Sequence, residues 1–211
     1  QHVYKDTGTF TVSLTVTNGA CSYKNSDTIK VINENPSFAY ESLQTNFCKY
    51  DSLRFFATQY NPENVKAFYW DLNDGRTQGF GSELDTVYHC YTSAGSYSPV
   101  LTLKDINNCV HTVEKQVPLK VYGPAAAFSN VNGNCIVQNI NFADESVSDG
   151  THTIVNWIWD YGDGSKSDTL TAPPFSHTYI KTGKYNVFLK VTDNNGCHDS
   201  VNSVEAIEVT Q

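Results

Sequence analysis

The sequence has no methionine, no run of 18 apolar residues and no cluster of basic residues. Without a long apolar run it offers no helix that could cross a bilayer, which takes about 20 apolar residues. Its 14 Lys and Arg are outnumbered by 22 Asp and Glu, for a net charge of −8. This acidic balance disfavours nucleic acid and anionic membranes as partners. The absence of methionine fits an internal segment of a longer chain.

The motifs of common catalytic and cofactor sites are missing as well. There is no G-x-S-x-G, no glycine-rich phosphate loop and no pair of Cys or His residues with zinc-ligand spacing. Ser, His and Asp are plentiful but form no recognisable catalytic set. We therefore expect a segment that is not an enzyme and holds no cofactor, with calcium the one metal to weigh.

What the sequence does contain is a repeat of 87 to 88 residues, present in three copies. The copies are His177, Tyr179, Gly183, Tyr185, Val187, Leu189, Val191 and Cys197; His89, Tyr91, Gly95, Tyr97, Pro99, Leu101, Leu103 and Cys109; and His2, Tyr4, Gly8, Phe10, Val12, Leu14, Val16 and Cys21. A repeat of this length is a whole domain rather than one turn of a solenoid. A string of such domains is suited to extending away from an attachment point and to spacing and presenting other parts of a long protein.

The periodicity within each copy is that of β-strands. Tyr185–Val191 alternates in side-chain direction at period two, and Phe10–Val16 does the same, which is typical of strands buried on one face. Asp193–Gly196 is rich in Asn and Gly and predicts a hairpin turn. Further strands are predicted at Ile140–Phe142, Trp157–Tyr161 and Ser200–Val209. No convincing amphipathic helix is visible, so the sequence predicts an all-β protein.

A longer signature points to a family. The last copy reads Trp159-Asp160-Tyr161-Gly162-Asp163-Gly164, then Ser176-His177-Thr178-Tyr179, then Gly183-Lys184-Tyr185-Asn186-Val187-Phe188-Leu189-Lys190-Val191. This resembles the PKD (polycystic kidney disease) domain family. The middle copy departs from the signature with Asn73 in place of a glycine and Cys90 between His89 and Tyr91. The resemblance implies tandem immunoglobulin-like β-sandwiches arranged end to end, with Trp70 and Trp159 between the sheets.

The register of the copies sets the expected domains. We expect residues 1–33 to be the C-terminal strands of a truncated PKD-like domain, and 36–121 and 123–209 to be two complete sandwiches. The apolar row of Phe10–Val16 needs an opposing sheet, because a lone strand pair is marginal in water. The linkers between domains are short, so the sequence predicts a semi-rigid rod.

Carboxylates near the tryptophans invite a calcium hypothesis. The low-ranked candidates are Asp160, Asp163 and Asp193, and some PKD-like domains bind calcium near this region. Against this, calcium takes about six to eight oxygens, and Asp in a tight turn ordinarily accepts local backbone N–H bonds while glycine takes the difficult φ. We favour the turn. We also expect the histidines that recur in register to be structural, bonded to nearby backbone.

The cysteines recur in register too, without metal spacing, which indicates disulfides and an oxidising, extracellular setting. Within-domain pairs would be Cys48–Cys109 and Cys135–Cys197. However, these sites lie at opposite ends of strands about 17–20 Å long, whereas a disulfide needs Cα atoms within about 7 Å. We therefore prefer Cys48–Cys197 across the two domains, with Cys109 and Cys135 paired outside the segment. The within-domain pairing stays open, and Cys90 competes as a partner of Cys48.

A further motif reads Asp, then Ser or Thr, then an apolar residue. It resembles the O-glycosylation motif of exported Bacteroidota proteins, and it also fits the ordinary start of a strand. No N-x-[S/T] sequon is present. The candidate sites are Thr28, Ser52, Thr86, Thr169 and Ser200.

The sequence together with the resemblance predicts a non-catalytic, extracellular repeat segment of a large surface adhesin or filament. The Asn195-Gly196-Cys197 ending is similar to PKD repeats of large exported surface proteins of the Bacteroidota. Neighbouring repeats of the same chain are the expected partners, together with polysaccharide or surface proteins that would meet loops or aromatics near Phe68, Tyr69 and Trp157. The alternative is a set of accessory modules of a secreted glycoside hydrolase or peptidase. Only the flanking sequence separates the two.

Overall fold

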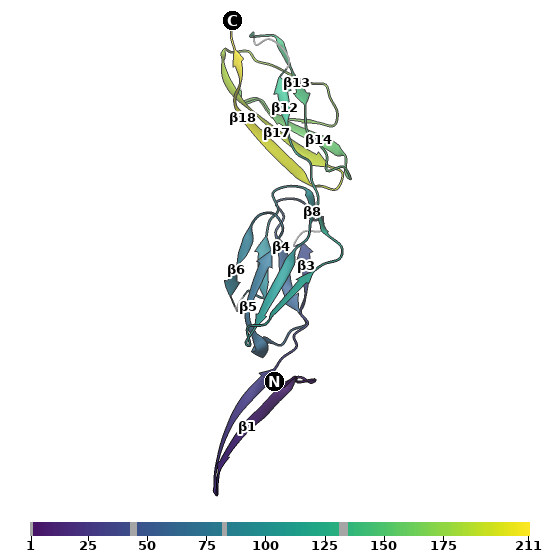
Figure 1. The fold of residues 1–211 in the computed structure, drawn as a ribbon. Coiled ribbons are helices and arrows are strands. Elements are labelled where there is room, and N and C mark those ends of the chain that lie inside the picture. Colours follow the sequence, from purple (N-terminus) through teal and green to yellow (C-terminus); the bar gives the residue numbers. More distant parts are fainter. Residues whose placement is uncertain (1, 43–45, 82–83, 131–134) are drawn as a thin grey trace. The chain divides into compact units, whose positions relative to one another are not determined.

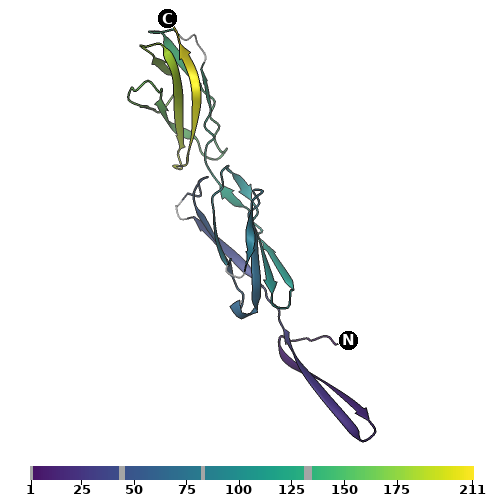
Figure 2. The same ribbon diagram turned by 90° about the vertical axis from the view of Figure 1, so that its left-hand side faces the viewer.

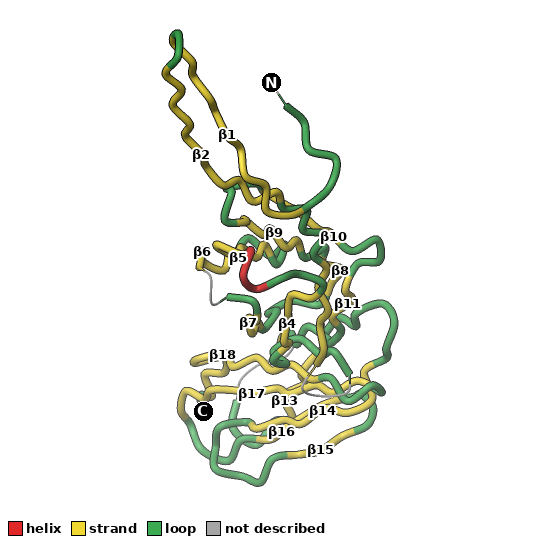
Figure 3. The backbone as a smooth tube through the Cα atoms, turned by 90° about the horizontal axis from the view of Figure 1, so that it is seen from below, coloured by secondary structure: helices red, strands yellow, loops and turns green. Residues whose placement is uncertain are grey.

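The structure, a computed structural model, describes residues 2–42, 46–81, 84–130 and 135–211. Strands make up nearly all of its regular structure, as the alternating pattern predicts (Figure 1). Among the described residues, the single turn of 3₁₀ helix η1 (Pro62–Asn64) is the only helical element (Figure 3). No helix in this part of the chain is long and apolar enough to span a membrane.

The first element is a hairpin of β1 (Gly8–Asn18) and β2 (Cys21–Val31), antiparallel from the Gly8–Val31 pair to the Asn18–Cys21 pair. The apolar row that we expected to need cover is exposed: 44% for Val12, 65% for Leu14 and 57% for Val16. Among the described residues no further sheet covers this row, and Phe10 is half-buried, so the need for a sheet from outside this segment stays a prediction. Each strand pairs with the other along one edge, and no other described strand pairs with their outer edges.

The described residues of the middle repeat form nine strands. They are β3 (Ser37–Ser42), β4 (Leu53–Thr58), β5 (Val65–Asp71), β6 (Thr77–Gly81), β7 (Thr86–His89), β8 (Gly95–Tyr97), β9 (Val100–Asp105), β10 (Val110–Glu114) and β11 (Leu119–Val121). They form sheets in the orders β3-β4-β7, β10-β9-β5-β6 and β11-β8. This is the two-layer pattern expected of an immunoglobulin-like sandwich.

Trp70 on β5 fills the interior of the middle repeat and is fully buried. Phe38 meets it edge to face at a centroid distance of 5.4 Å, and Phe55 lies at 6.2 Å. Phe68 is also buried and packs in the core, whereas Tyr69 is half-buried, and binding near these aromatics stays a prediction. The tryptophan therefore holds the two sheets together, as the sequence predicts.

In the last repeat, the part of the chain that the structure describes forms seven strands: β12 (Phe128–Asn130), β13 (Asn139–Asp144), β14 (Ile154–Asp160), β15 (Asp168–Leu170), β16 (Phe175–Thr178), β17 (Gly183–Asp193) and β18 (His198–Val209). Their sheets have the orders β12-β13-β16 and β15-β14-β17-β18. Figure 2 shows β17 and β18 side by side as the two long strands of this repeat. Trp159 is fully buried between the sheets, with Phe128, Phe142 and Phe175 around it.

The described chain divides into two compact units. One holds Gln1–Ala39, Phe55–Val87 and Pro99–Gln116, and the other holds Tyr40–Arg54, Tyr88–Ser98 and Val117–Gln211. The division runs through the middle repeat. The second unit thus contains the whole last repeat together with the end of the middle repeat that carries Cys48.

Candidate functional site

The segments 46–51, 121–126 and 193–199, all in the second compact unit, come together around one disulfide; we call them the junction. Cys48 lies just before β4, in an irregular loop that is fixed by its backbone. The N–H of Lys49 donates to the Tyr122 carbonyl at 2.7 Å, and the N–H of Tyr122 donates to the Phe47 carbonyl at 2.9 Å. These bonds align the loop parallel to the end of β11. The backbone on either side of Cys48 is therefore fixed by hydrogen bonds, which sets the direction of its side chain.

Cys197 is held by a buried carboxylate. Asp193 ends β17, and its Oδ1 accepts the backbone N–H groups of Asn195 and Cys197, each at 2.9 Å. The N–H of Asp193 donates to the Cys197 carbonyl at 2.9 Å and closes the turn that Asn and Gly predict. Both Asp193 and Cys197 are buried. The turn thus holds the backbone that carries the sulfur.

The structure joins Cys48 to Cys197, with a Cα–Cα distance of 5.3 Å and a sequence separation of 149 residues. The bond links the middle repeat to the last one. It uses one cysteine from each of the within-domain pairs that the sequence left open, so neither of those pairs forms. Cys21, Cys90 and Cys109 are exposed free thiols, and Cys135 is a half-buried one.

A buried ion pair accompanies the disulfide. The Lys49 ammonium lies 2.9 Å from the Asp199 carboxylate, and their side chains are 6% and 15% exposed. Asp199 also accepts the backbone N–H of Ala126 at 2.9 Å. Burial opposes the charge on Asp199, but the hydrogen bonds from Ala126 and Lys49 outweigh it and lower the pKa of the carboxyl. A paired and hydrogen-bonded charge of this kind ties three segments of the junction to one another.

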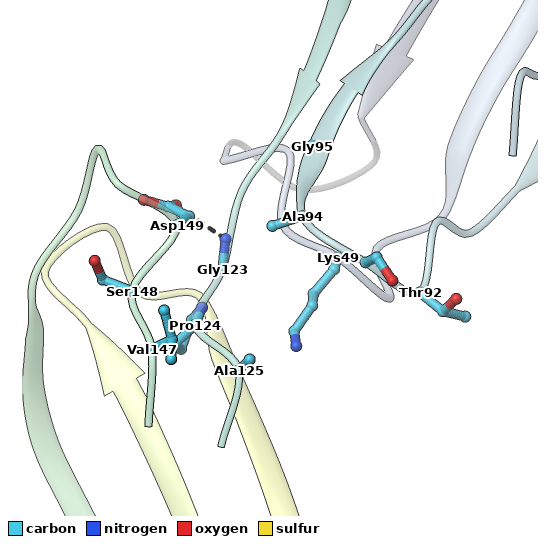
Figure 4. A pocket seen from close by; sticks show the side chains of 11 residues that line it. Lys49, Thr92, Ala94, Gly95, Gly123, Pro124, Ala125, Val147, Ser148 and Asp149 are labelled. Carbon is cyan, nitrogen blue, oxygen red and sulfur yellow. Dashed lines mark hydrogen bonds between the residues drawn. The ribbon is translucent and has the colours of Figure 1, made fainter. Parts of the chain in front are cut away.

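The linker between the two repeats passes through the same place. The N–H of Gly123 donates to Asp149 Oδ2 at 3.0 Å (Figure 4). With φ at +133°, Gly123 adopts a conformation that favours glycine, and a Cβ there would press on the stem of Lys49 and contact Cys197. An open pocket of about 380 Å³ lies beside it, with Lys49 and Asp149 in its wall. The linker is therefore closely packed at the disulfide.

The donor atoms of Asp149, His152 and Asp193 lie within 4.8 Å of one another. Burial opposes the charge on Asp149, but hydrogen bonds from His152 and from the Gly123 N–H lower the pKa of its carboxyl to about 2. Oδ2 of Asp193 is buried and has no hydrogen-bond partner. Two carboxylates and an imidazole supply fewer oxygens than the roughly six to eight that calcium takes. The group does not fit calcium by itself.

The predicted calcium candidates do not converge. Asp160 ends β14 and is separated along that strand from Asp193, which pairs with Ile154 at its other end. Asp160 and Asp163 instead accept the backbone N–H groups of Gly162 and Ser165, each at 2.9 Å. Calcium binding stays a prediction, while the turn that we favoured is what the local bonds show.

His177 has a different partner from the one expected. Its Nε2 lies 2.8 Å from Asp163 Oδ2, and its ring stacks on Tyr161 at a centroid distance of 4.1 Å. The expected bond to backbone is wrong for this histidine; it bridges a carboxylate and an aromatic ring. Its role remains structural, because it pins the turn after β14 to β16. Burial opposes the charge of Asp163, but bonds from Ser165 and His177 lower the pKa of that carboxyl to about 2.

The glycosylation candidates all lie at least partly at the surface. Thr28, Thr169 and Ser200 are exposed, and Ser52 and Thr86 are half-buried. Trp157, named above as a surface aromatic, is buried and donates its indole N–H to Asp144. The sequence reasoning missed the Lys49–Asp199 pair. One signal was available: where these positions recur in the other copies they are Ile136 and His111, so neither the lysine nor the aspartate is kept.

Comparison with known proteins agrees with this architecture. The model of the PKD domain family matches residues 33–121 and 123–209. Collagenase ColA of Clostridium perfringens is 38% identical over 92 residues, which are 44% of this chain and 7% of that protein. A microbial collagenase of Vibrio alginolyticus is 38% identical over 73 residues, 35% of this chain and 9% of that one. The chain thus spans less than a tenth of either relative's length.

Among solved structures, the PKD1 domain of the Vibrio cholerae metalloprotease PrtV is 29% identical. It is matched over 99% of its length by 42% of this chain, with a TM-score of 0.35. The family model accounts for most of the residues, and its two matches coincide with the middle and last repeats. The chain belongs to the PKD domain family, with two members in tandem.

Proposed function

We propose that this segment is a non-catalytic, extracellular spacer in a multi-repeat surface adhesin or filament, in which a disulfide carries tension from one PKD domain to the next. The observation that carries the proposal is the Cys48–Cys197 bond. A bond between successive domains would serve little purpose in modules that act independently. A disulfide of this kind persists in an oxidising setting, which supports an extracellular location.

The bond changes the path that a force would follow. Tension applied at the two ends of the chain reaches Cys48 through β3 and Cys197 through β18, and the covalent bond joins these two points. The residues between the two cysteines form a closed loop that the force bypasses. This loop contains Trp70 and Trp159, so both cores lie outside the direct path. Under drag, the strands outside the loop, β3 and β18, would detach before force reaches the core residues inside it.

The junction contacts add stiffness to this linkage. The Lys49–Asp199 pair and the Gly123–Asp149 bond tie the linker to both repeats. Asn46 and Asn195 form two further hydrogen bonds. The Asn46 side-chain amide donates to the Asn195 carbonyl at 2.6 Å, and the Asn195 side-chain amide donates to the Asn46 carbonyl at 3.4 Å. Such contacts restrain bending more than a short linker does alone.

Rotational diffusion measured by NMR relaxation tests the proposal. With the disulfide intact, amides of 36–121 and 123–209 should report one common tumbling time. After reduction they should report two shorter and different times. Independent tumbling of the two domains in the oxidised chain would contradict the spacer function.

A second candidate is an accessory module of a secreted enzyme. It is favoured by the relatives, two of which are named as collagenases. Co-sedimentation with insoluble collagen separates the two: an accessory module that binds this substrate is retained, whereas a spacer stays in the supernatant. We also propose that at least one of the Asp-[Ser/Thr]-apolar sites carries a glycan on native material. An intact mass equal to that of the bare polypeptide would exclude it.

A further inference from the structure

Both halves of the junction occur a second time in the chain, each with a free cysteine. The loop at Cys135 reproduces the loop at Cys48. Cys135 lies parallel to Thr210 as Cys48 does to Tyr122. The Ile136 N–H donates to the Thr210 carbonyl at 2.9 Å, where Lys49 donates to Tyr122 at 2.7 Å. From Cys135 onward, the last repeat therefore repeats the backbone bonds that hold Cys48 in the middle repeat.

The turn at Cys109 likewise reproduces the turn at Cys197. Asp105 ends β9, is fully buried, and accepts the N–H groups of Asn107 and Cys109 with Oδ1, each at 2.9 Å. The Asp105 N–H donates to the Cys109 carbonyl at 3.0 Å, as Asp193 does to Cys197 at 2.9 Å. Cys109 is exposed and its sulfur is free. Each of the two free cysteines thus has a counterpart that the structure shows bonded.

The neighbouring residues are matched as well. In the junction, Lys49 faces Asp199. The corresponding residues beside the free cysteines are Ile136 and His111, and His111 already has a carboxylate partner, since its Nε2 lies 3.2 Å from Asp105 Oδ2. Joining these two surfaces would bring an aliphatic side chain against a paired imidazole. Docking would therefore bury no unpaired charge at these two positions. An unpaired charge would be buried if only the lysine or only the aspartate of the junction pair had been kept.

We propose that the surface around Cys135 docks onto the surface around Cys109 of a second copy of this repeat and forms a disulfide with it. This inference rests on the proposed function, because it assumes that repeats of this chain join through the contact seen at Cys48–Cys197. Bond formation needs an oxidant, and a small-molecule disulfide such as oxidised glutathione serves. The Cys135 thiolate attacks it and releases one glutathione thiolate; the Cys109 thiolate then attacks Cys135 Sγ and releases the second. Two protein thiols become one disulfide, and the oxidant becomes two thiols.

The test uses the 211-residue chain at high concentration in a glutathione redox buffer, followed by non-reducing electrophoresis and peptide mapping. Molecules should join head to tail into a ladder of multimers. The Cys135–Cys109 peptide should exceed every other new pair by about tenfold, the ratio that a modest docking energy provides. Cys21 is an informative competitor, because it occupies the same repeat position but follows a two-residue turn with no buried carboxylate. It should be used far less than Cys109.

Matched variants complete the experiment. Cys109→Ser, at an exposed site, should abolish the ladder, whereas Cys21→Ser and Cys90→Ser should leave it unchanged. Random pairing among the four free cysteines, or monomers capped by glutathione, would overturn the inference. The same digest reports the Cys48–Cys197 peptide. If that peptide is recovered without Cys135–Cys109, this inference fails while the spacer function stands; if it is missing, the junction itself fails.

Discussion

Replacing both Cys48 and Cys197 with serine should destabilise each PKD domain by about 3 to 5 kcal/mol. The magnitude follows from the position of the bond. When only residues 123–209 unfold, Cys48 and Val121 stay fixed in the folded neighbour, so the disulfide closes a loop of about 75 residues, for which chain entropy gives about 4.5 kcal/mol. Unfolding of the middle domain alone closes a loop of similar length. Each domain therefore gains stability from the other.

A loss of this size is a large share of the roughly 5 to 15 kcal/mol that stabilises an ordinary domain. Guanidinium titration followed by the indole N–H signals in NMR spectra resolves the two domains, because Trp70 reports the middle one and Trp157 and Trp159 report the last. Both domains of the double variant should unfold at lower guanidinium concentrations. Reduction of the unaltered chain should reproduce the shift, and Cys90→Ser serves as the control. Unchanged midpoints in the double variant would refute the loop-closure argument.

Three further results are expected from the same titration. Lys49→Met removes the buried partner of Asp199 and should cost about 2 to 3 kcal/mol, whereas adding Asp199→Asn to it should recover most of the loss; no loss in the single variant would show that the pair is dispensable. Gly162→Ala should lower the free energy of unfolding by at least about 3 kcal/mol, because the new Cβ would overlap a carbonyl oxygen of β17. Gly164 has a similar φ but open space around it, so Gly164→Ala should cost only about 1 kcal/mol. Equal costs for the two variants would contradict this reasoning. The last domain should lose stability as the pH falls from about 4 to about 2, because the Asp163 pKa of about 2 lies below that of the unfolded chain, so the unfolded state binds more protons in this window. The Asp149 carboxyl, with a pKa of about 2, contributes over the same window, so Asp163→Asn should reduce the slope without removing it; an unchanged slope in that variant would contradict the role of Asp163.

Much of the fold could be predicted because its signals are local and repeated. Period-two alternation located β17, and the buried tryptophans follow from a signature that recurs in two copies. The disulfide partners also followed from the repeat, since strand direction places Cys48 and Cys109 at opposite ends of one sandwich. These inferences needed only spacing and topology.

The contacts that sequence reasoning missed occur once and depend on loops. Lys49 meets Asp199 only because the Cys48 loop and the start of β18 approach each other, and no other copy keeps the pair. His177 was expected to bond to backbone because the register gave its strand but not the path of the turn carrying Asp163. The hairpin residues Phe10–Val16 carry the repeat pattern of a buried strand, yet most of their apolar row is exposed. Periodicity shows which side chains suit a core and does not supply the opposing surface.

Single-molecule stretching of the chain from its two ends tests the central claim most directly. With the Cys48–Cys197 bond intact, complete unfolding should extend the chain to only about 210 Å, because the 149-residue separation between the cysteines is bypassed. Adding a thiol reductant under load should release a further step of about 500 Å. An extension of about 700 Å without reductant would show that the force passes through both domain cores, and would contradict a disulfide that carries tension between them.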